Sequence, residues 1–488
     1  MKTLEKVHYQ GFIWPLIVGV ILWCITPWRP TGLTPQAWEM FAIFVATIVG
    51  CITKPLPIGG TTLTGLVVMV LAGLAPINNV VNPKTGVITK GILSAFSNSA
   101  AWLIAMAFIM AYGITKTGLG NRIAYWMIER FGKKSLGIGY AITGLELILG
   151  ALIPSNSART GGVVWPLTKS ISESYDSKPN DSSRKKIGSY IDLVAFHANI
   201  LSTALFLTGA AANVVAQQMA AQKGYQMTWA SWFIVAIVPV AIAAIIVPWL
   251  LYKIYPPEIK ETPNAKQWAK DNLIKMGKVT VPEKIMAAVF ALSILLWILS
   301  GIIKVPQLDA TFVAFLAVTL LLLTGVLTAQ DIFNQAGAWN ILVWLSILVF
   351  MAGKLISFGF IAWFSKSIQM SLHGISWGVV LVILVLVMFY THYFFASGTA
   401  HVTALYLPFL SVAVATGAPL PLAAMLLAFT TVINNSSTHY ANPSASILAT
   451  TGYVTQGEWW KNNFIIGLVY LVIFGVIGTL WMKVLGMW

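Results

Sequence analysis

Two short polar segments interrupt long apolar stretches of this 488-residue chain. The first, Ser155-Asn156-Ser157, lies within residues 137–166, and the second, Ser397-Gly398-Thr399, lies within residues 377–408. Their side chains offer hydroxyl and amide groups, and the glycine weakens a helix. A helix that restarts after each break presents unpaired N–H groups and a partial positive charge, which bind anions. Two such helix ends suit a substrate with a carboxylate at each end.

A charged residue follows the first break. Arg159 offers a two-pronged donor face that matches a carboxylate. The break contains no acidic residue, and Glu146 is the nearest one in sequence. We therefore expect Arg159 to have no fixed partner and to bind a substrate carboxylate. The alternative places Arg159 at the cytoplasmic end of the hairpin, where it extends toward the interface or contacts backbone carbonyls.

Three further residues are candidates for the same site. His401 follows Ser397 by four residues, as Arg159 follows Ser155, and could donate a hydrogen bond or act as a second cation. A satisfied interior histidine is the alternative. Thr438 and Asn442 are candidates in a later polar segment, although hydrogen bonding between helices would also explain them. Asn442-Pro443 is expected to break the tenth helix.

The composition excludes a soluble globular protein. The chain is 58% hydrophobic and 9% charged, with a mean hydropathy of +0.80, whereas about a quarter of an ordinary soluble chain is charged. Apolar runs of roughly 18 residues, long enough to cross a bilayer, recur along the whole sequence. We expect an all-α polytopic membrane protein with about eleven transmembrane helices and two re-entrant hairpins, and no cofactor.

The net charge of +15 indicates orientation rather than nucleic-acid binding. Lysine and arginine gather in three loops, the third within residues 253–284. Cytoplasmic loops collect such residues. The three loops share one side if the N-terminus is cytoplasmic, the C-terminus is extracellular, and each hairpin enters and leaves on the same side. A bacterial plasma membrane is the expected location.

The two halves of the chain align at one spacing. Subtracting 155 from 397 gives an offset of 242, which also pairs Trp102 with Trp344 and Pro166 with Pro408. An odd number of spans in each repeat inverts one copy relative to the other, as in secondary transporters that bind substrate at broken helices. The predicted divisions are 1–50 (first helix and start of the scaffold), 51–252 (repeat 1), 253–284 (basic cytoplasmic linker) and 285–488 (repeat 2).

Motifs of other function classes are missing from the sequence. There is no GxxxxGK[ST] loop for ATP, no cysteine or histidine cluster with metal-ligand spacing, and no nucleophilic triad. We therefore expect neither a metal site nor enzymatic activity. A membrane enzyme or receptor that uses the polar breaks as its active site is the alternative from another class.

The paired breaks in a repeated chain resemble the divalent anion:sodium symporter (DASS) family. The segments 155–162 and 396–406 resemble its exchanger branch, which includes plastid 2-oxoglutarate/malate translocators and bacterial citrate/succinate or dicarboxylate antiporters. The resemblance covers almost the whole chain. It implies a homodimer with a scaffold domain and a transport domain that moves as an elevator. Sodium-coupled members carry asparagine where this chain has Gly398, which puts that ion site in doubt.

Together these features predict sodium-independent exchange of small dicarboxylates. The resemblance implies 2-oxoglutarate, malate, succinate and fumarate as candidate substrates, with citrate as a further candidate. An empty carrier with an unpaired Arg159 would expose a buried cation to a dry barrier, whereas a loaded carrier would not. A sodium-coupled di- or tricarboxylate symporter of the same fold is the alternative.

Overall fold

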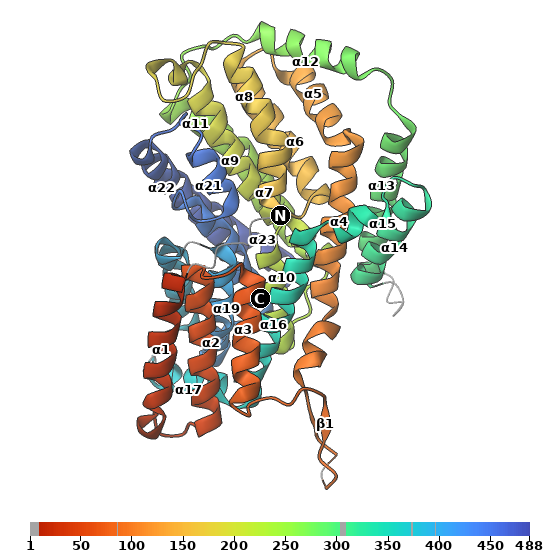
Figure 1. Ribbon diagram of the computed structural model, residues 1–488. Helices are drawn as coiled ribbons and strands as arrows, with labels where there is room; N and C mark the ends of the chain where they lie inside the picture. The colour runs from red at the N-terminus through yellow and green to blue at the C-terminus, as the bar shows by residue number, and fades with distance from the viewer. Residues whose placement is uncertain (1–8, 85, 303–308, 372–373, 396) are drawn as a thin grey trace.

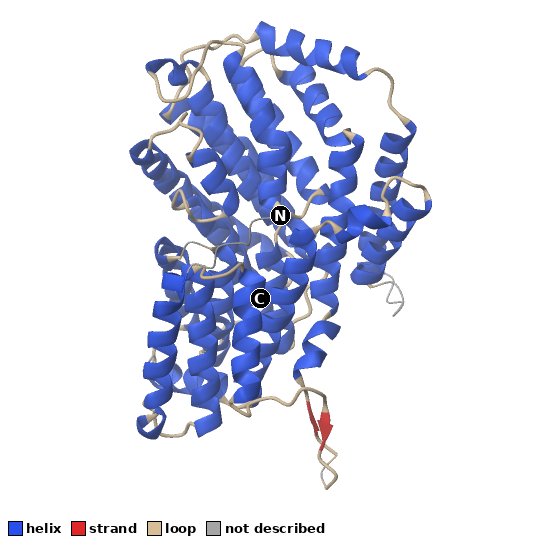
Figure 2. Cartoon of the chain, in the orientation of Figure 1, coloured by secondary structure: helices blue, strands red, loops and turns tan. Residues whose placement is uncertain are grey.

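A chain that lies in lipid must satisfy its backbone hydrogen bonds internally, which favours helices. A computed structural model describes residues 9–84, 86–302, 309–371, 374–395 and 397–488. Throughout these residues the chain is predominantly helical (Figure 2), as the composition predicts. Its one described sheet pairs β1 (Val80–Val81) with β2 (Ile88–Thr89) and projects from one end of the molecule (Figure 1).

The helices of the first half include one that is wholly internal. Every residue of α9 is buried, and α9 packs against α6, α8 and α11. In chain order the α-helices are α1 (Ile13–Cys24), α2 (Pro35–Thr53), α3 (Ile58–Leu71), α4 (Ser99–Thr117), α5 (Leu119–Phe131), α6 (Ser135–Leu152), α7 (Asn156–Arg159), α8 (Trp165–Glu173), α9 (Gly188–Leu205), α10 (Ala211–Gln222) and α11 (Trp229–Ile254).

The second half begins with α12, which lies across the end of the molecule opposite the β-hairpin (Figure 1). Its α-helices are α12 (Pro263–Met276), α13 (Val281–Ile302), α14 (Ala310–Leu323), α15 (Ala329–Phe333), α16 (Ala336–Ser357), α17 (Phe360–Ser371), α18 (Trp377–Tyr390), α19 (Gly398–Ala415), α20 (Leu420–Ile433), α21 (Pro443–Ala449), α22 (Gln456–Val472) and α23 (Thr479–Val484).

Shorter helical turns of two kinds fill several of the gaps between these helices. The 3-10 turns are η1 (Tyr9–Phe12), η2 (Thr26–Trp28), η3 (Ile92–Ser97), η5 (Ser182–Lys186), η6 (Leu207–Gly209), η7 (Thr391–Phe394) and η8 (Asn434–Ser436). The π-helical turns are η4 (Thr160–Val164) and η9 (Ile473–Gly478).

The polytopic fold class is confirmed. Within the described residues, 8 helical segments are long and apolar enough to cross a membrane, and five shorter apolar helices accompany them. The number of long spans differs from the predicted eleven because several predicted spans are short, and because two of the eight are Trp377–Phe394 and Gly398–Ala415, the arms of the predicted second hairpin.

Each predicted break coincides with an interruption, but only its first residue, Ser155 or Ser397, is non-helical, because Asn156 and Gly398 already begin the next helices. Residues 153–155 separate α6 from α7, and the turn η7 with residues 395 and 397 lies between α18 and α19. Adding 242 to 156 and 173, the outer ends of α7 and α8, gives 398 and 415, the two ends of α19. The same offset therefore relates the backbone of the two restarting helices, although the first copy contains the π-helical turn η4.

The match between the two repeats fails at α9, whose counterpart is interrupted. The residues that match α9 lie at 430–447, where α20 ends at Ile433 and α21 begins only at Pro443. Proline lacks a backbone N–H and is tolerated in the first turn of a helix but not in its interior. Asn442 caps the new helix, since its Oδ1 accepts a hydrogen bond from Ala445 N at 2.8 Å. The predicted break at Asn442-Pro443 is confirmed.

The basic linker predicted at residues 253–284 contains α12, which packs against α5. Trp268 of α12 meets Tyr125 of α5 edge to face, with ring centroids 5.3 Å apart. The assignment of this end to the cytoplasm remains a prediction, as do the division into domains and the sides of the two termini. Residues 1–8, which include the N-terminus, lie outside the described residues.

Candidate functional site

The two breaks carry the same helix cap. Ser155 Oγ accepts a hydrogen bond from Ala158 N at 3.2 Å, and Ser397 Oγ accepts one from Ala400 N at 3.3 Å. In each case the serine is extended and the helix begins at the next residue. A serine cap satisfies one of the unpaired N–H groups and leaves others free at the first turn. Both predicted helix starts therefore have the geometry that can receive an anion.

Arg159 is completely buried and has a carboxylate partner. Its Nε donates to Glu146 Oε2 at 3.0 Å, across the break from α7 to α6. Its Nη1 donates to the carbonyl oxygens of Ile153 and Gly209, and its Nη2 donates to Thr203 Oγ1 at 2.9 Å. The guanidinium group is thus surrounded by protein acceptors.

The expectation that Arg159 lacks a fixed partner is therefore wrong. Glu146 is thirteen residues away in sequence but the return of the chain after the break brings it alongside. The alternative interpretation, in which Arg159 contacts backbone carbonyls, is correct in part. Arg159 is therefore not an unpaired cation that would prevent the empty carrier from returning, because the Arg159–Glu146 pair is neutral as a whole.

Glu146 is the centre of a network that the sequence interpretation missed. Its carboxylate also accepts hydrogen bonds from Asn199 Nδ2, at 3.2 and 3.3 Å, and from Ser202 Oγ at 3.0 Å. A buried ion pair is costly unless further hydrogen bonds satisfy its remaining lone pairs, and here two residues of α9 do so. The sequence alone could have indicated Glu146, because an ionisable residue in an apolar membrane segment is by default a functional candidate.

Asn199 joins the first break to the second half of the chain. Its Nδ2 lies 3.4 Å from the carbonyl oxygen of Asn156, and its Oδ1 accepts a hydrogen bond from Ser444 Oγ at 3.0 Å. Ser444 lies in α21, which packs against α7 and η4. The Asn199 side chain therefore hydrogen-bonds both to the first break and to the helix that begins after Asn442.

His401 is buried, with a partner at each ring nitrogen. Nε2 lies 3.0 Å from Thr391 Oγ1, and Asn434 Nδ2 lies 3.3 Å from Nδ1. The Thr391 hydroxyl donates to Val387 O at 2.7 Å, so it accepts from the imidazole, and the amide of Asn434 donates to the other nitrogen. This pattern fits a neutral ring protonated on Nε2. It favours the interior-histidine alternative for His401.

Gly398 is packed against an asparagine from another element. A Cβ atom at Gly398 would lie 2.8 Å from Asn435 Oδ1, closer than real Cβ contacts allow. Asn435 is held in turn, because its Nδ2 donates to Thr431 O at 2.9 Å and to Val432 O at 3.0 Å. A side chain at position 398 would therefore displace Asn435 from these hydrogen bonds.

The segment 434–442 runs between the two breaks. Its first residues, in η8, contact His401 and Gly398 of the second break, and its last residue caps α21 beside the first. Within it, Ser437 Oγ and Thr438 Oγ1 are buried and have no hydrogen-bond partner among the described residues. A buried hydroxyl without a partner costs free energy. These two groups are therefore available to a ligand.

The remaining predicted site residues lie at the two helix starts. Ser157 Oγ is 3.1 Å from Ser155 Oγ, and the side chains of Asn156 and Ser157 are partly exposed. Thr399 is also partly exposed and is the second residue of α19. The candidate site residues thus lie at three places: the two helix starts, and the segment that runs between them.

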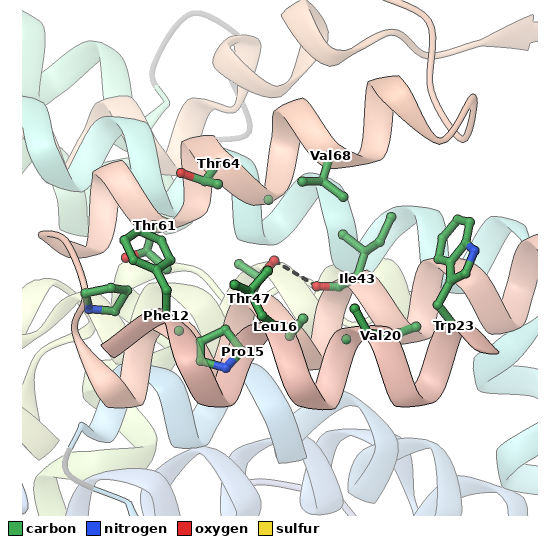
Figure 3. Close-up of a pocket in the computed structure, with 16 residues that line it drawn as sticks. Phe12, Pro15, Leu16, Val20, Trp23, Ile43, Thr47, Thr61, Thr64 and Val68 are labelled. Carbon is green, nitrogen blue, oxygen red and sulfur yellow. Dashed lines mark hydrogen bonds between the residues drawn. The ribbon is translucent and has the colours of Figure 1, made fainter. Parts of the chain in front are cut away.

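A separate cavity of about 260 Å³ lies between α1, α2 and α3 (Figure 3). Its lining is almost entirely apolar, with Phe12, Leu16 and Trp23 among the side chains drawn (Figure 3). None of the candidate site residues lines it. Its chemistry suits hydrocarbon rather than a charged substrate.

Comparison with known proteins adds independent information. The model of the sodium:sulfate symporter transmembrane region matches residues 6–488. YflS of Bacillus subtilis (strain 168), whose name describes it as a malate transporter, is 44% identical over 96% of this chain and 95% of its own. The chloroplastic dicarboxylate transporter 1 of Spinacia oleracea is 41% identical over 97% of this chain and 81% of its own. The L-tartrate/succinate antiporter of Shigella sonnei (strain Ss046) is 34% identical over 98% of both chains.

Two solved structures share the fold at low sequence identity. The YdaH transporter of Alcanivorax borkumensis aligns with a TM-score of 0.55 at 11% identity, over 92% of this chain and 98% of its own. MtrF of Neisseria gonorrhoeae aligns with a TM-score of 0.52 at 13% identity, over 94% and 97%. These likenesses concern the fold alone. Because the family model matches nearly the whole chain, this protein belongs to the sodium:sulfate symporter family, which is the divalent anion:sodium symporter family.

Proposed function

We propose that this protein is a secondary transporter that exchanges small dicarboxylates across a membrane by antiport. The observation that carries the proposal is the pair of matched helix starts, capped by Ser155 and Ser397 in the same way. Each start offers unpaired N–H groups and the positive end of a helix dipole. Relatives named as dicarboxylate transporters and as an L-tartrate/succinate antiporter support the substrate class and the exchange mode.

The substrate contacts in this proposal come from the two breaks and from the segment between them. Ser155, Asn156 and Ser157 contribute one helix start. Ser397, Thr399 and the backbone of Gly398 contribute the other. Thr438 supplies an unpartnered hydroxyl, and Asn442 holds the end of its segment in place through the cap on α21. Malate, succinate, fumarate and 2-oxoglutarate are the first candidates, followed by citrate.

Arg159 and His401 receive a revised role. Both side chains are buried, and each of their nitrogen atoms has a hydrogen-bond partner in the protein. We therefore assign them as positioning residues: Arg159 fixes the first helix start against α6 and α9, and His401 fixes the second against η7 and η8. A substrate carboxylate would have to displace Glu146 to reach Arg159.

Exchange without sodium is proposed on two grounds. Gly398 takes the place of the asparagine that helps to bind sodium in coupled members of the family, and a side chain there would displace Asn435. The carboxylate of Glu146 is already paired with Arg159 and bonded to Asn199 and Ser202, so it presents no uncompensated negative charge that would require a bound cation. In the proposed cycle a homodimer of scaffold domains holds two transport domains, which carry the breaks across a bacterial plasma membrane in an elevator motion.

Uptake by proteoliposomes tests this function. Labelled succinate, malate, fumarate, 2-oxoglutarate and citrate are offered in turn to vesicles that are empty or contain unlabelled dicarboxylate. Antiport predicts uptake only into loaded vesicles, with equal rates in sodium and in potassium or choline buffers. Rapid uptake into empty vesicles driven by a sodium gradient would instead establish the alternative, a sodium-coupled symporter of the same fold. Chemical change of the substrate would indicate an enzyme.

A further inference from the structure

A second cavity, whose lining is partly polar, lies apart from the helix breaks. Its volume is about 830 Å³, and it is bounded by β2, η3, the start of α4, the end of α10 and the last part of α16. These elements meet at the end of the molecule that carries the β-hairpin (Figure 1). The charge distribution predicts that this end faces away from the cytoplasm. Nothing in the proposed transport site uses these residues.

Lys354 is the most unusual residue in this cavity. It lies in the last turn of α16, is only 7% exposed, and has no carboxylate within salt-bridge distance among the described residues. Its Nζ lies 5.3 Å from the ring centre of Phe350 and 5.9 Å from that of Phe358. Aromatic faces attract a cation, but they do not neutralise it. A buried ammonium group without a counter-ion is a feature that an anion would complete.

Ser346 gives a second, independent indication. It lines the same cavity two helical turns before Lys354, is 1% exposed, and its Oγ has no hydrogen-bond partner in the described part of the chain. Buried hydroxyls normally find a partner. An occupant with acceptor atoms would satisfy Ser346 and Lys354 together.

Two other parts of the lining also favour a negatively charged occupant. The N-terminus of the 19-residue helix α4 opens into the cavity at Asn98 and Ser99, and Asn98 Nδ2 donates to Gln218 Oε1 of α10 at 3.2 Å. Lys90 adds a second positive charge at the rim, and no aspartate or glutamate is present in the lining. A helix N-terminus favours negative charge. Lys354, Lys90 and the start of α4 therefore favour an anion, whereas Gln222 Oε1, unpartnered among the described residues, and the C-terminal ends of α10 and α16, which also line the cavity, favour a hydrogen-bond donor beside it.

We propose that this cavity is a second anion-binding site, which holds a small dicarboxylate through Lys354, Ser346 and the N-terminal end of α4. The charge of the occupant follows from the cavity itself, whereas its identity as a dicarboxylate rests on the proposed function. The site lies between α10 and the pair α4 and α16. An anion bound there is separate from the transport site and lies at the end of the molecule that carries the β-hairpin.

Equilibrium binding of labelled succinate to the full-length protein in nanodiscs of zwitterionic lipid tests this proposal. We expect two classes of site in the wild type. Lys354→Gln should weaken one class at least tenfold and leave the other unchanged, and Ser346→Ala should weaken the same class. Lys84→Gln is the matched control, because Lys84 is an exposed lysine of the same β-hairpin that does not line the cavity. Ser155→Ala should weaken the class that Lys354→Gln leaves intact.

The outcomes separate the two proposals. Retention of a full class of sites in Lys354→Gln shows that the variant is folded. A single class in the wild type, or two classes unaffected by Lys354→Gln, overturns the second site and leaves the proposed function standing. Absence of all succinate binding and exchange overturns the proposed function instead. If added phosphatidylglycerol abolishes the Lys354-dependent class, a lipid phosphate occupies the cavity and the dicarboxylate proposal is overturned.

Discussion

Arg159 Nε donates to Glu146 Oε2 at 3.0 Å, with both side chains fully buried. The pair joins the helix that precedes the first break to the helix that follows it. Buried pairs of this kind add little net stability compared with apolar residues, but the loss of one partner leaves an uncompensated charge. Stable folding therefore requires the first helix start to lie where Arg159 can reach Glu146. This relationship replaces the simpler expectation of a free arginine waiting for substrate.

Removing either charge should destabilise the protein much more than removing both. Arg159→Met or Glu146→Gln alone should lower the free energy of unfolding by about 3–5 kcal/mol, since a buried charge is left unpaired. The double variant should recover a large part of that loss. Thermal unfolding in nanodiscs measures the effect. The exposed Lys169–Glu173 pair, at 3.8 Å, is the matched control, and Lys169→Met should change stability by less than about 1 kcal/mol.

Arg159→Lys tests the positioning role separately from charge. Lysine keeps the cation but cannot reproduce the planar set of bonds to Glu146, Thr203 and Gly209. We expect a folded protein with a reduced rate of exchange and nearly normal dependence on ionic strength. Wild-type exchange by Arg159→Lys would show that the geometry of this network does not matter for transport.

Gly398 should tolerate no side chain. Gly398→Ala places a Cβ atom 2.8 Å from Asn435 Oδ1, and overpacking of this kind costs about 1–3 kcal/mol. We expect lower stability and slower succinate exchange. Gly378→Ala, in the preceding arm α18, is the matched control, because a Cβ atom there meets nothing within 4 Å. Combining Gly398→Ala with Asn435→Ala should relieve the clash; if stability does not recover, another contact is responsible.

The serine caps should contribute to transport beyond their contribution to stability. Ser155→Ala and Ser397→Ala each remove one capping bond, at a cost of about 1 kcal/mol. Thr34→Ala removes an equivalent bond of 3.2 Å at the start of α2, away from the breaks. All three variants should lose similar stability in thermal unfolding. Only the two serine variants should lose exchange activity, and equal activity in all three would argue against substrate binding at the helix starts.

Replacing the hydroxyl of Thr438 should lower substrate affinity without lowering stability. Its hydroxyl has no partner in the described residues, so Thr438→Val should leave the empty protein equally stable or slightly more stable. If the hydroxyl binds substrate, the affinity for succinate should fall about tenfold, the equivalent of roughly 1.4 kcal/mol. Ser436→Ala is the control, because the Ser436 hydroxyl already donates to Ile433 O at 2.6 Å. Unchanged affinity in Thr438→Val would remove Thr438 from the site.

Local sequence was sufficient for the features that depend on neighbouring residues. Apolar runs predicted helices, and the polar interruptions at Ser155 and Ser397 predicted where two of them break. The offset of 242 predicted that α19 matches the segment from α7 to α8, and Pro443 predicted the interruption of the later helix. Each of these features follows from backbone hydrogen bonding, proline geometry or periodicity within a few residues.

Partners across the fold required the tertiary structure. Glu146 lies thirteen residues before Arg159, and nothing in their spacing shows that the break turns one toward the other. Asn434 and Thr391 reach His401 from different helices, and Asn435 closes the space beside Gly398. Such contacts depend on the rotation and depth of each helix in the bundle. The sequence alone determined where the helices break and that the chain spans a membrane, whereas helix packing decided which polar groups are satisfied by protein and which remain free for a ligand.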